Sequence, residues 1–246
     1  MKTPSNITPW VYKAEEDFRT TITMVRKRKD PVPDNVCFCA DLLRVRADGS
    51  SSPRPVVEGV SLVGETADWS GDGRYLVYTR KEQESYDLWV YDLSGEQTPF
   101  AIVETEHDEF VPELSPDGRY LAYQSDESGI PQVYVISFPS SEGKWPVSKD
   151  GGLSPRWNKD GTELFYISGT INDRRLTVVP VSTRGVFRAG TPTVQFSTES
   201  IRAAGVNFDV TADGKRFVMV QHIADSERST ITEVQNWYTE CKDKQP

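Results

Sequence analysis

Side chains able to do acid, base or metal chemistry are few in this sequence and far apart. It has two histidines, and His107 lies in the run Glu106-His107-Asp108-Glu109. Neighbouring carboxylates can raise the pKa of an imidazole or help it to hold a cation. A solvated loop histidine is the simpler interpretation, and His222 has no distinctive neighbour. The histidines therefore do not by themselves predict a site.

The three cysteines suggest neither a disulfide framework nor a metal centre. They are Cys37, Cys39 and Cys241, an odd and small number. A metal site at the first two would need two further ligands close by. We therefore expect ordinary packing thiols, no metal and no cofactor.

Motifs of known catalytic centres are also missing from the sequence. It contains no Gly-x-Ser-x-Gly, no phosphate-binding loop of the Gly-Lys-Ser/Thr type and no Cys-x-x-Cys. Asp126-Glu127 is most simply solvated loop charge, and no pair of carboxylates can be assigned as general acid and base from spacing alone. We expect no catalytic residue, and hence a protein that is not an enzyme.

Composition and charge narrow the class of partner. The 246 residues are 37% hydrophobic and 26% charged, which is typical of a globular protein, and the net charge is -9. Nucleic-acid binders usually present a basic face. The single basic run, Arg26-Lys27-Arg28-Lys29, reads as a solvated loop. We expect a protein or peptide partner and no nucleic acid, with cationic or neutral partners favoured.

Apolar runs in the sequence are short. None approaches the ~18 residues of a membrane span, and residues 1–15 lack the apolar core of a signal peptide. We therefore expect no membrane segment and a cytoplasmic location for the chain as written, or a periplasmic one if its N-terminus is truncated.

An internal repeat is the strongest structural signal. A four-residue pattern ending in Asp-Gly recurs with its aspartates 45, 43 and 53 residues apart (72 to 117, 117 to 160, 160 to 213). A Ser, Asn or Thr at the first position can hydrogen-bond to the turn backbone, and Gly supplies a positive φ. The four copies are Ser70-Gly71-Asp72-Gly73, Ser115-Pro116-Asp117-Gly118, Asn158-Lys159-Asp160-Gly161 and Thr211-Ala212-Asp213-Gly214.

Each turn is followed by strand-like runs at regular offsets. The first run comes directly after the turn, as in Arg119-Tyr120-Leu121-Ala122-Tyr123. A second run begins at one constant offset from the turn aspartate in three units (72 to 87, 117 to 132, 160 to 175) and slightly later in the last (213 to 230). With further short runs between turn signals, each unit holds four short strands in about 45 residues, the size of one β-propeller blade.

These motifs resemble a known family. The pattern Trp69-Ser70-Gly71-Asp72-Gly73-Arg74 and its copies are similar to the WD-repeat-like blades of TolB-type propellers. More narrowly, the sequence resembles the propeller region C-terminal to some bacterial serine/threonine kinases, in Lys144-Trp145-Pro146-Val147-Ser148 and Ile231-Thr232-Glu233-Val234-Gln235-Asn236-Trp237 among other segments. The resemblance covers roughly residues 36–240. It implies an all-β propeller, and the repeats in this sequence account for about four full blades plus a partial one, with an incomplete ring as one alternative.

The predicted limits of the units leave the closure of the ring open. Residues 1–35 are a divergent segment that, in one alternative, supplies a closing strand from Thr20–Val25 to the last blade. In the other alternative the ring stays incomplete, and its exposed ends favour self-association. The units are a partial blade at 36–62, blades at 63–106, 107–150, 151–203 and 204–240, and a tail at 241–246.

One set of polar residues follows from the repeat. Its members lie two positions before each turn, on the first strand of the unit, which in propellers is nearest the axis. We predict that they form a polar rim on the central funnel, with salt bridges inside a blade or plain solvation as the alternative. The residues are Asp68, Glu113, Arg156 and Asp209, and their neighbours Trp69, Leu114, Trp157 and Val210 are predicted core.

The sequence thus favours a non-catalytic binding module of TolB-like propeller type. It would engage a protein, peptide or small ligand at the funnel or the top loops. The alternative is a substrate-gating propeller fragment of a larger enzyme, peptidase-like or kinase-associated. A lyase or hydrolase with its own funnel site is poorly supported, because it would need histidines or carboxylates clustered in a catalytic arrangement on the inner strands, and the sequence gives little sign of one.

Overall fold

Five antiparallel sheets make up the described part of the chain. The computed structural model describes residues 10–11, 20–26, 39–46, 52, 54–61, 67–82, 84–95, 98–170, 173–197, 208–221 and 230–234. Within those residues the chain forms twenty strands and no helix, so the all-β prediction is confirmed. The described residues include no helix that is long and apolar enough to cross a membrane.

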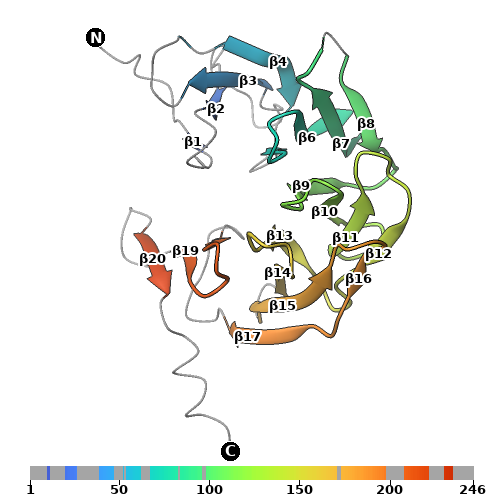
Figure 1. Ribbon diagram of the computed structural model, residues 1–246, viewed down its shortest axis with the longest axis vertical. Coiled ribbons are helices and arrows are strands. Elements are labelled where there is room, and N and C mark those ends of the chain that lie inside the picture. The colour runs from blue at the N-terminus through green and yellow to red at the C-terminus, as the bar shows by residue number, and fades with distance from the viewer. Residues whose placement is uncertain are drawn as a thin grey trace, which may run out of the picture.

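Each sheet uses strands that follow one another in the chain, and we number the sheets as blades 1 to 5. Figure 1 shows the blades succeeding one another around a common centre. Blade 1 contains β1 (Trp10–Val11), β2 (Thr20–Arg26), β3 (Cys39–Arg46) and β4 (Arg54–Ser61). Blade 2 contains β5 (Ala67–Trp69), β6 (Tyr75–Glu82), β7 (Ser85–Asp92) and β8 (Phe100–Val103). Blade 3 contains β9 (Glu109–Leu114), β10 (Tyr120–Ser125), β11 (Gln132–Ser137) and β12 (Lys144–Pro146). Blade 4 contains β13 (Leu153–Trp157), β14 (Glu163–Ser168), β15 (Arg175–Ser182), β16 (Arg188–Ala189) and β17 (Thr193–Ser197). Blade 5 contains β18 (Phe208–Val210), β19 (Phe217–Gln221) and β20 (Thr230–Val234).

Blade 1 corrects the interpretation of the N-terminal residues. Strand β2 pairs with β3 from Thr20 opposite Arg46 to Arg26 opposite Ala40, and β1 pairs with β2. The alternative in which Thr20–Val25 closes the last blade is therefore wrong, because this segment pairs with β3 inside blade 1. The partial unit predicted at 36–62 contributes two strands to a four-stranded sheet. The sequence signal failed here because no Asp-Gly turn stands between β1 and β2.

Closure of the ring stays a prediction. Among the described strands, no pairing joins blade 5 to blade 1. The predicted tail at 241–246, together with His222, Cys37 and Cys241, lies outside the described residues.

The four repeated turns share one hydrogen-bond pattern. In blade 3, Ser115 Oγ donates to Asp117 Oδ1 (2.7 Å), which also accepts the Arg119 N–H (3.2 Å). The Tyr120 N–H donates back to Ser115 Oγ (3.0 Å). Blades 2 and 5 repeat these bonds, and in blade 4 Asn158 Oδ1 accepts the equivalent Glu163 N–H (3.0 Å). The turn glycines have φ of 70°, 68°, 69° and 69°, as the sequence predicted.

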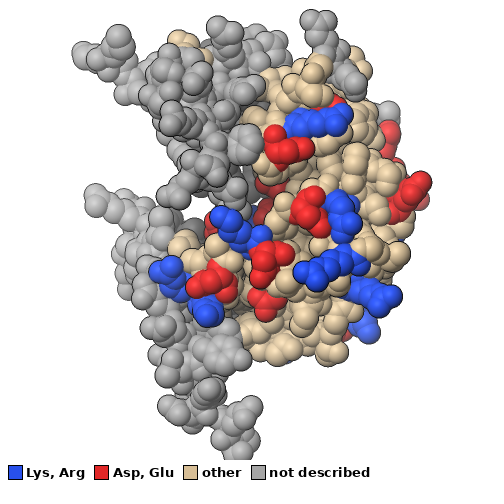
Figure 2. Space-filling model, viewed as in Figure 1, with Lys and Arg blue, Asp and Glu red and all other residues tan. Residues whose placement is uncertain are grey.

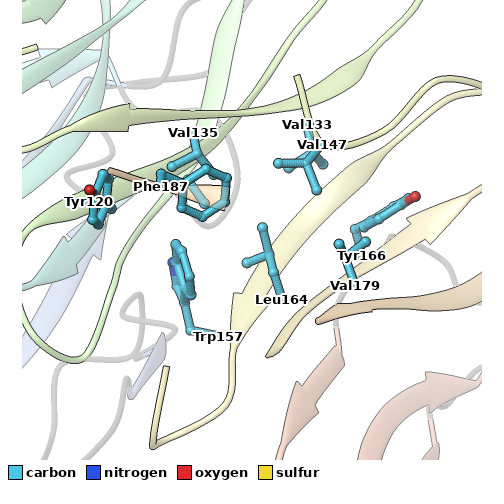
Figure 3. Packing of buried hydrophobic residues seen from close by; sticks show 10 residues of the cluster. Tyr120, Val133, Val135, Val147, Trp157, Leu164, Tyr166, Val179 and Phe187 are labelled. Atoms are coloured by element: carbon cyan, nitrogen blue, oxygen red, sulfur yellow. The ribbon is translucent and has the colours of Figure 1, made fainter. Parts of the chain in front are cut away.

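Aromatic packing holds blades 3 and 4 together. Phe187, 2% exposed, comes from the segment Thr183–Phe187 between β15 and β16 and packs against Tyr120, Trp145 and Trp157. Figure 3 shows Phe187 beside Tyr120 and Trp157. The Tyr120 hydroxyl donates to the Gly185 carbonyl oxygen (2.5 Å). The segment explains part of the longer repeat spacing after Asp160, because it adds a loop that reaches back to blade 3.

Substitution of a turn glycine tests the repeat. Gly118→Val is expected to destabilise the protein by roughly 1–3 kcal/mol, because a β-branched residue resists positive φ. No heavy atom lies within 4 Å of a Cβ built at Gly118, so the cost comes from the backbone and not from a clash. Gly71→Ala is the control, since Gly71 lacks a positive φ and its Cβ would meet only an ordinary contact at 3.6 Å. Chemical denaturation measures the stability of both variants. Equal denaturation midpoints would contradict the assignment of Gly118 to a turn position that requires positive φ.

Truncation of the buried Phe187 side chain tests the contact between blades 3 and 4. Phe187→Ala should cost about 3–5 kcal/mol of unfolding free energy, because it leaves a cavity among three other aromatic rings. Val186→Ala, at a residue 66% exposed, should change the free energy by less than about 0.5 kcal/mol. Urea unfolding measures the free energy of both variants. Similar losses of unfolding free energy would show that the burial of Phe187 does not account for its contribution to stability.

Candidate functional site

The predicted rim residues occupy equivalent places in the fold. Asp68, Glu113, Arg156 and Asp209 lie on β5, β9, β13 and β18, the first strand of each blade. Figure 1 shows β9 and β13 on the inner side of their sheets. The predicted core neighbours are also placed as expected. Leu114 and Trp157 belong to buried clusters between blades, and Trp69 and Val210 pack against two others.

Contacts of the rim residues run between blades. Glu113 Oε2 lies 3.6 Å from Arg156 Nη1, with side chains 14% and 7% exposed. Asp68 Oδ2 accepts the Leu114 N–H (2.7 Å), so it joins blade 2 to blade 3. Trp157 Nε1 donates to the Glu113 carbonyl oxygen (3.0 Å), which joins blade 3 to blade 4. These side chains thus hold neighbouring inner strands together, whereas Asp209 is exposed on β18.

Two inner strands carry a bulge that the sequence analysis missed. Val111 and Ser154 have φ of 52° and 51°, and the register of their strands shifts at the same place. Positive φ is rare for a β-branched residue, and bulges re-aim the side chains that follow them. Pro112 and Pro155 come directly after, immediately before Glu113 and Arg156. A proline repeated directly before the rim position was the available signal.

A second polar region lies at the blade ends away from the Asp-Gly turns. Strand β9 runs from Glu109 toward the turn at 115–118, and β10 runs back to Ser125. The segments Glu104–Asp108 and Asp126–Pro131 are therefore at the opposite end, together with the β6–β7 hairpin. We call these three segments the top loops.

Hydrogen bonds tie the top loops to one another. The Tyr86 N–H donates to Asp108 Oδ1 (3.1 Å), and the Asp108 N–H donates to Asp126 Oδ1 (3.0 Å). His107, the histidine that the sequence singled out, has Nδ1 3.9 Å from Asp126 Oδ1, with both side chains nearly half exposed. The loop between blades 2 and 3 is thus attached to both of them.

Aromatic and acidic side chains share this end of the molecule. The rings of Tyr86 and Phe110 are 4.9 Å apart between centroids, and Lys81 Nζ lies 5.4 Å from the Tyr86 ring. Both aromatic residues are only partly buried. The exposed carboxylates of the top loops belong to Glu84, Glu104 and Glu106. On the face that Figure 2 shows, the described basic and acidic side chains are interspersed.

Comparison of the sequence finds partial relatives. No family model matches the chain. The TolB protein of the Tol-Pal system from Alcanivorax borkumensis is 29% identical over 106 residues, 42% of this chain and 24% of that protein. The uncharacterized peptidase YuxL of Bacillus subtilis is 29% identical over 123 residues, 44% of this chain and 18% of that protein. The matched segments thus span less than a quarter of each of these two relatives.

Solved structures share the fold over most of the chain. A putative TolB from Agrobacterium tumefaciens aligns with a TM-score of 0.66 and 14% identity, over 94% of this chain and 77% of that one. The β-propeller domain of the Trilobed protease from Pyrococcus furiosus aligns with a TM-score of 0.55 and 14% identity, over 93% and 69%. The fold is therefore a β-propeller. Its repeats and its relatives define it further as a propeller of the TolB type, while the narrower resemblance to kinase-associated propellers stays a prediction.

A double-mutant cycle tests the contact across the inner strands. Arg156→Met is expected to destabilise the protein by about 3–5 kcal/mol, because it leaves the Glu113 carboxylate without this cation in a largely buried place. Adding Glu113→Gln should then cost much less than it does alone. Equilibrium denaturation of the wild type, the two single variants and the double variant gives the coupling free energy between the two side chains. Strictly additive losses of unfolding free energy would show that the two side chains do not interact.

Proposed function

We propose that this propeller is a non-catalytic binding module that engages a protein or peptide through its top loops. The observation that carries the proposal is the partly exposed pair of Tyr86 and Phe110, set among exposed carboxylates. Aromatic side chains are enriched at protein interfaces, where they combine apolar area with a polar edge. The pair thus offers a partly exposed apolar contact point between blades 2 and 3.

Charge favours a cationic partner at this surface. Glu84, Glu104 and Glu106 are exposed near the aromatic pair, and the whole chain has a net charge of -9. Acidic groups speed the approach of basic partners and disfavour acidic ones. A segment with lysine or arginine beside an apolar residue matches both features of the surface.

The top loops are also held in place before any partner binds. Hydrogen bonds through Asp108 connect Tyr86 of blade 2 to Asp126 of blade 3. A surface that is already ordered loses less conformational entropy on binding than a loose loop does. The funnel rim supports binding less well, because Glu113 and Arg156 already contact each other. Binding of a small ligand at that rim stays a prediction.

A second candidate is the propeller part of a larger enzyme. The similarity to the peptidase YuxL and to the Trilobed protease propeller supports it. The sequence contains no Gly-x-Ser-x-Gly, so in this alternative a separate domain would carry the nucleophile. The genomic reading frame around the coding sequence distinguishes the two candidates, because a fused hydrolase or kinase domain would be encoded beside it.

Site-specific photo-crosslinking tests the binding surface. A photo-reactive residue in place of Phe110 should capture a partner in the native host. The same residue in place of Ala212, exposed at a turn on the opposite end, should not. The charge reversals Glu104→Lys and Glu106→Lys together should reduce capture at least about tenfold while the melting temperature changes little, because both residues are exposed. Equal capture from both positions, or capture unaffected by the reversals, would refute the proposal.

A further inference from the structure

Two carboxyl groups, one in blade 2 and one in blade 3, are almost fully buried. Glu109 begins β9 and is 0% exposed, and Asp87 on β7 is 1% exposed. Acidic side chains are almost never fully buried unless they are paired with a cation or lose their charge. Asp87 accepts hydrogen bonds from Ser85 and Thr105, whereas neither the binding proposal nor the propeller fold itself explains the burial of Glu109.

Hydrogen bonds satisfy only part of the Glu109 carboxyl. Its Oε1 accepts from the hydroxyls of Thr105 (2.8 Å) and Ser125 (3.1 Å). Its Oε2 is buried and has no hydrogen-bond partner among the described residues. Thr105 also donates its N–H to Asp87 Oδ1 (3.3 Å), so one residue of the top loops contacts both carboxyls. A bare carboxylate oxygen in such a place favours the protonated form.

The charges around Glu109 act in opposite directions. Burial is the main effect and raises the pKa of Glu109 to about 7, and the negative charge of Asp87 raises it further. Lys144 on β12 lowers the pKa, although its ammonium group also pairs with Glu127 and lies 4.5 Å from the Tyr134 ring. Tyr123 on β10 also interacts electrostatically with Glu109, and burial raises the pKa of this phenol.

The interface between blades 3 and 4 has residues that correspond to these in the repeat, and it can be compared with the interface between blades 2 and 3. In the repeat, Gln132 stands in the same relation to the turn aspartate Asp117 as Asp87 does to Asp72. Ser148 and Gly152 likewise precede Asp160 by the same intervals at which Thr105 and Glu109 precede Asp117. The repeat therefore pairs Gln132 with Asp87, Ser148 with Thr105 and Gly152 with Glu109.

The equivalent residues between blades 3 and 4 are neutral. Ser148 Oγ donates to Gln132 Oε1 (2.5 Å), and Gln132 Nε2 donates to the Lys149 carbonyl oxygen (2.7 Å). The same place in the fold is therefore held without any carboxyl group. The buried Glu109 carboxyl, where the repeat has Gly152 at the next interface, is therefore a special feature, and its chemistry needs another reason.

We infer that the buried Glu109 carboxyl holds a proton at this interface, and that its release as the pH rises loosens the segment Glu104–Asp108. The segment is the part that responds, because its Thr105 contacts both carboxyls and its Asp108 bonds to both blades. The inference does not depend on any partner of the top loops. No group of three or more metal-ligating side chains occurs in the described part of the chain, so a proton fits the Glu109 carboxyl better than a metal ion does.

The direction of the pH dependence follows from linkage. In the unfolded chain Glu109 titrates at its ordinary value of 4.5, and in the folded protein at about 7. The protonated form is thus favoured by folding. Its contribution to stability is complete below pH 4.5 and is lost as the pH rises through 7. Between pH 5 and 8 this single group should raise the unfolding equilibrium constant on the order of 50-fold.

Comparison of wild type with Glu109→Gln measures that effect. The substitution keeps the shape of the side chain and cannot ionise, so it should remove roughly that 50-fold dependence and unfold at higher denaturant concentration than wild type at pH 8. Glu104→Gln, at an exposed carboxylate of the same segment, is the matched control and should follow the wild type. If Glu109→Gln and wild type show the same pH dependence, the inference is wrong.

Two further measurements on the wild-type protein keep the test independent of the variant's folding. Carbon NMR of the glutamate carboxyls should show one midpoint near 7, and midpoints that all lie below 5.5 would overturn the inference. Hydrogen exchange should show falling protection of the Asp108 amide from pH 6 to 8 while the Gly118 amide in the turn keeps its protection. Equal behaviour of both amides would refute the local loosening. Stabilisation at pH 8 by calcium or magnesium that Glu109→Gln abolishes would show that the Glu109 carboxyl binds a cation and not a proton.

Discussion

Contact between neighbouring blades is the constraint on which the rest of this structure depends. A sheet of four short strands has two faces, and neither can be covered from within the same sheet. The buried clusters accordingly draw residues from two consecutive blades, as Leu88 and Tyr123 do between blades 2 and 3. The rim contact between Glu113 and Arg156 crosses the same kind of boundary nearer the centre. Loss of one blade would therefore uncover its neighbours.

Local turn chemistry made most of the fold predictable. The Asp-Gly turns repeat one hydrogen-bond pattern, which locates a strand pair in four blades from the residue types alone. Blade 1 was predicted only in part, because no Asp-Gly turn stands between its first two strands, and those strands had to be recognised from weaker apolar patterns. The role of Phe187 was also hidden. Nothing in its own neighbourhood in the sequence indicates that it packs against Trp145 of another blade.

The candidate sites were less predictable than the fold. Repeat spacing put Glu113 and Arg156 at equivalent strand positions, but it could not show that they contact each other across a blade boundary. The Glu109 carboxyl looked like one more charge in an acidic loop, because burial is set by packing and not by the neighbouring residues in the chain. Only the fold brings it close to Asp87, which belongs to the preceding blade and lies well before it in the sequence.

The use of consecutive strands in every described sheet has a consequence for synthesis on the ribosome. A propeller that borrows a strand from the other end of its chain must wait for the whole polypeptide before that sheet is complete. Here each of blades 1 to 4 has all its described strands once its own segment has emerged, and it can then serve as the surface on which the next segment folds. The Pyrococcus furiosus propeller aligned above is described as having an open velcro topology. In the present chain, the order of assembly can follow the order of translation.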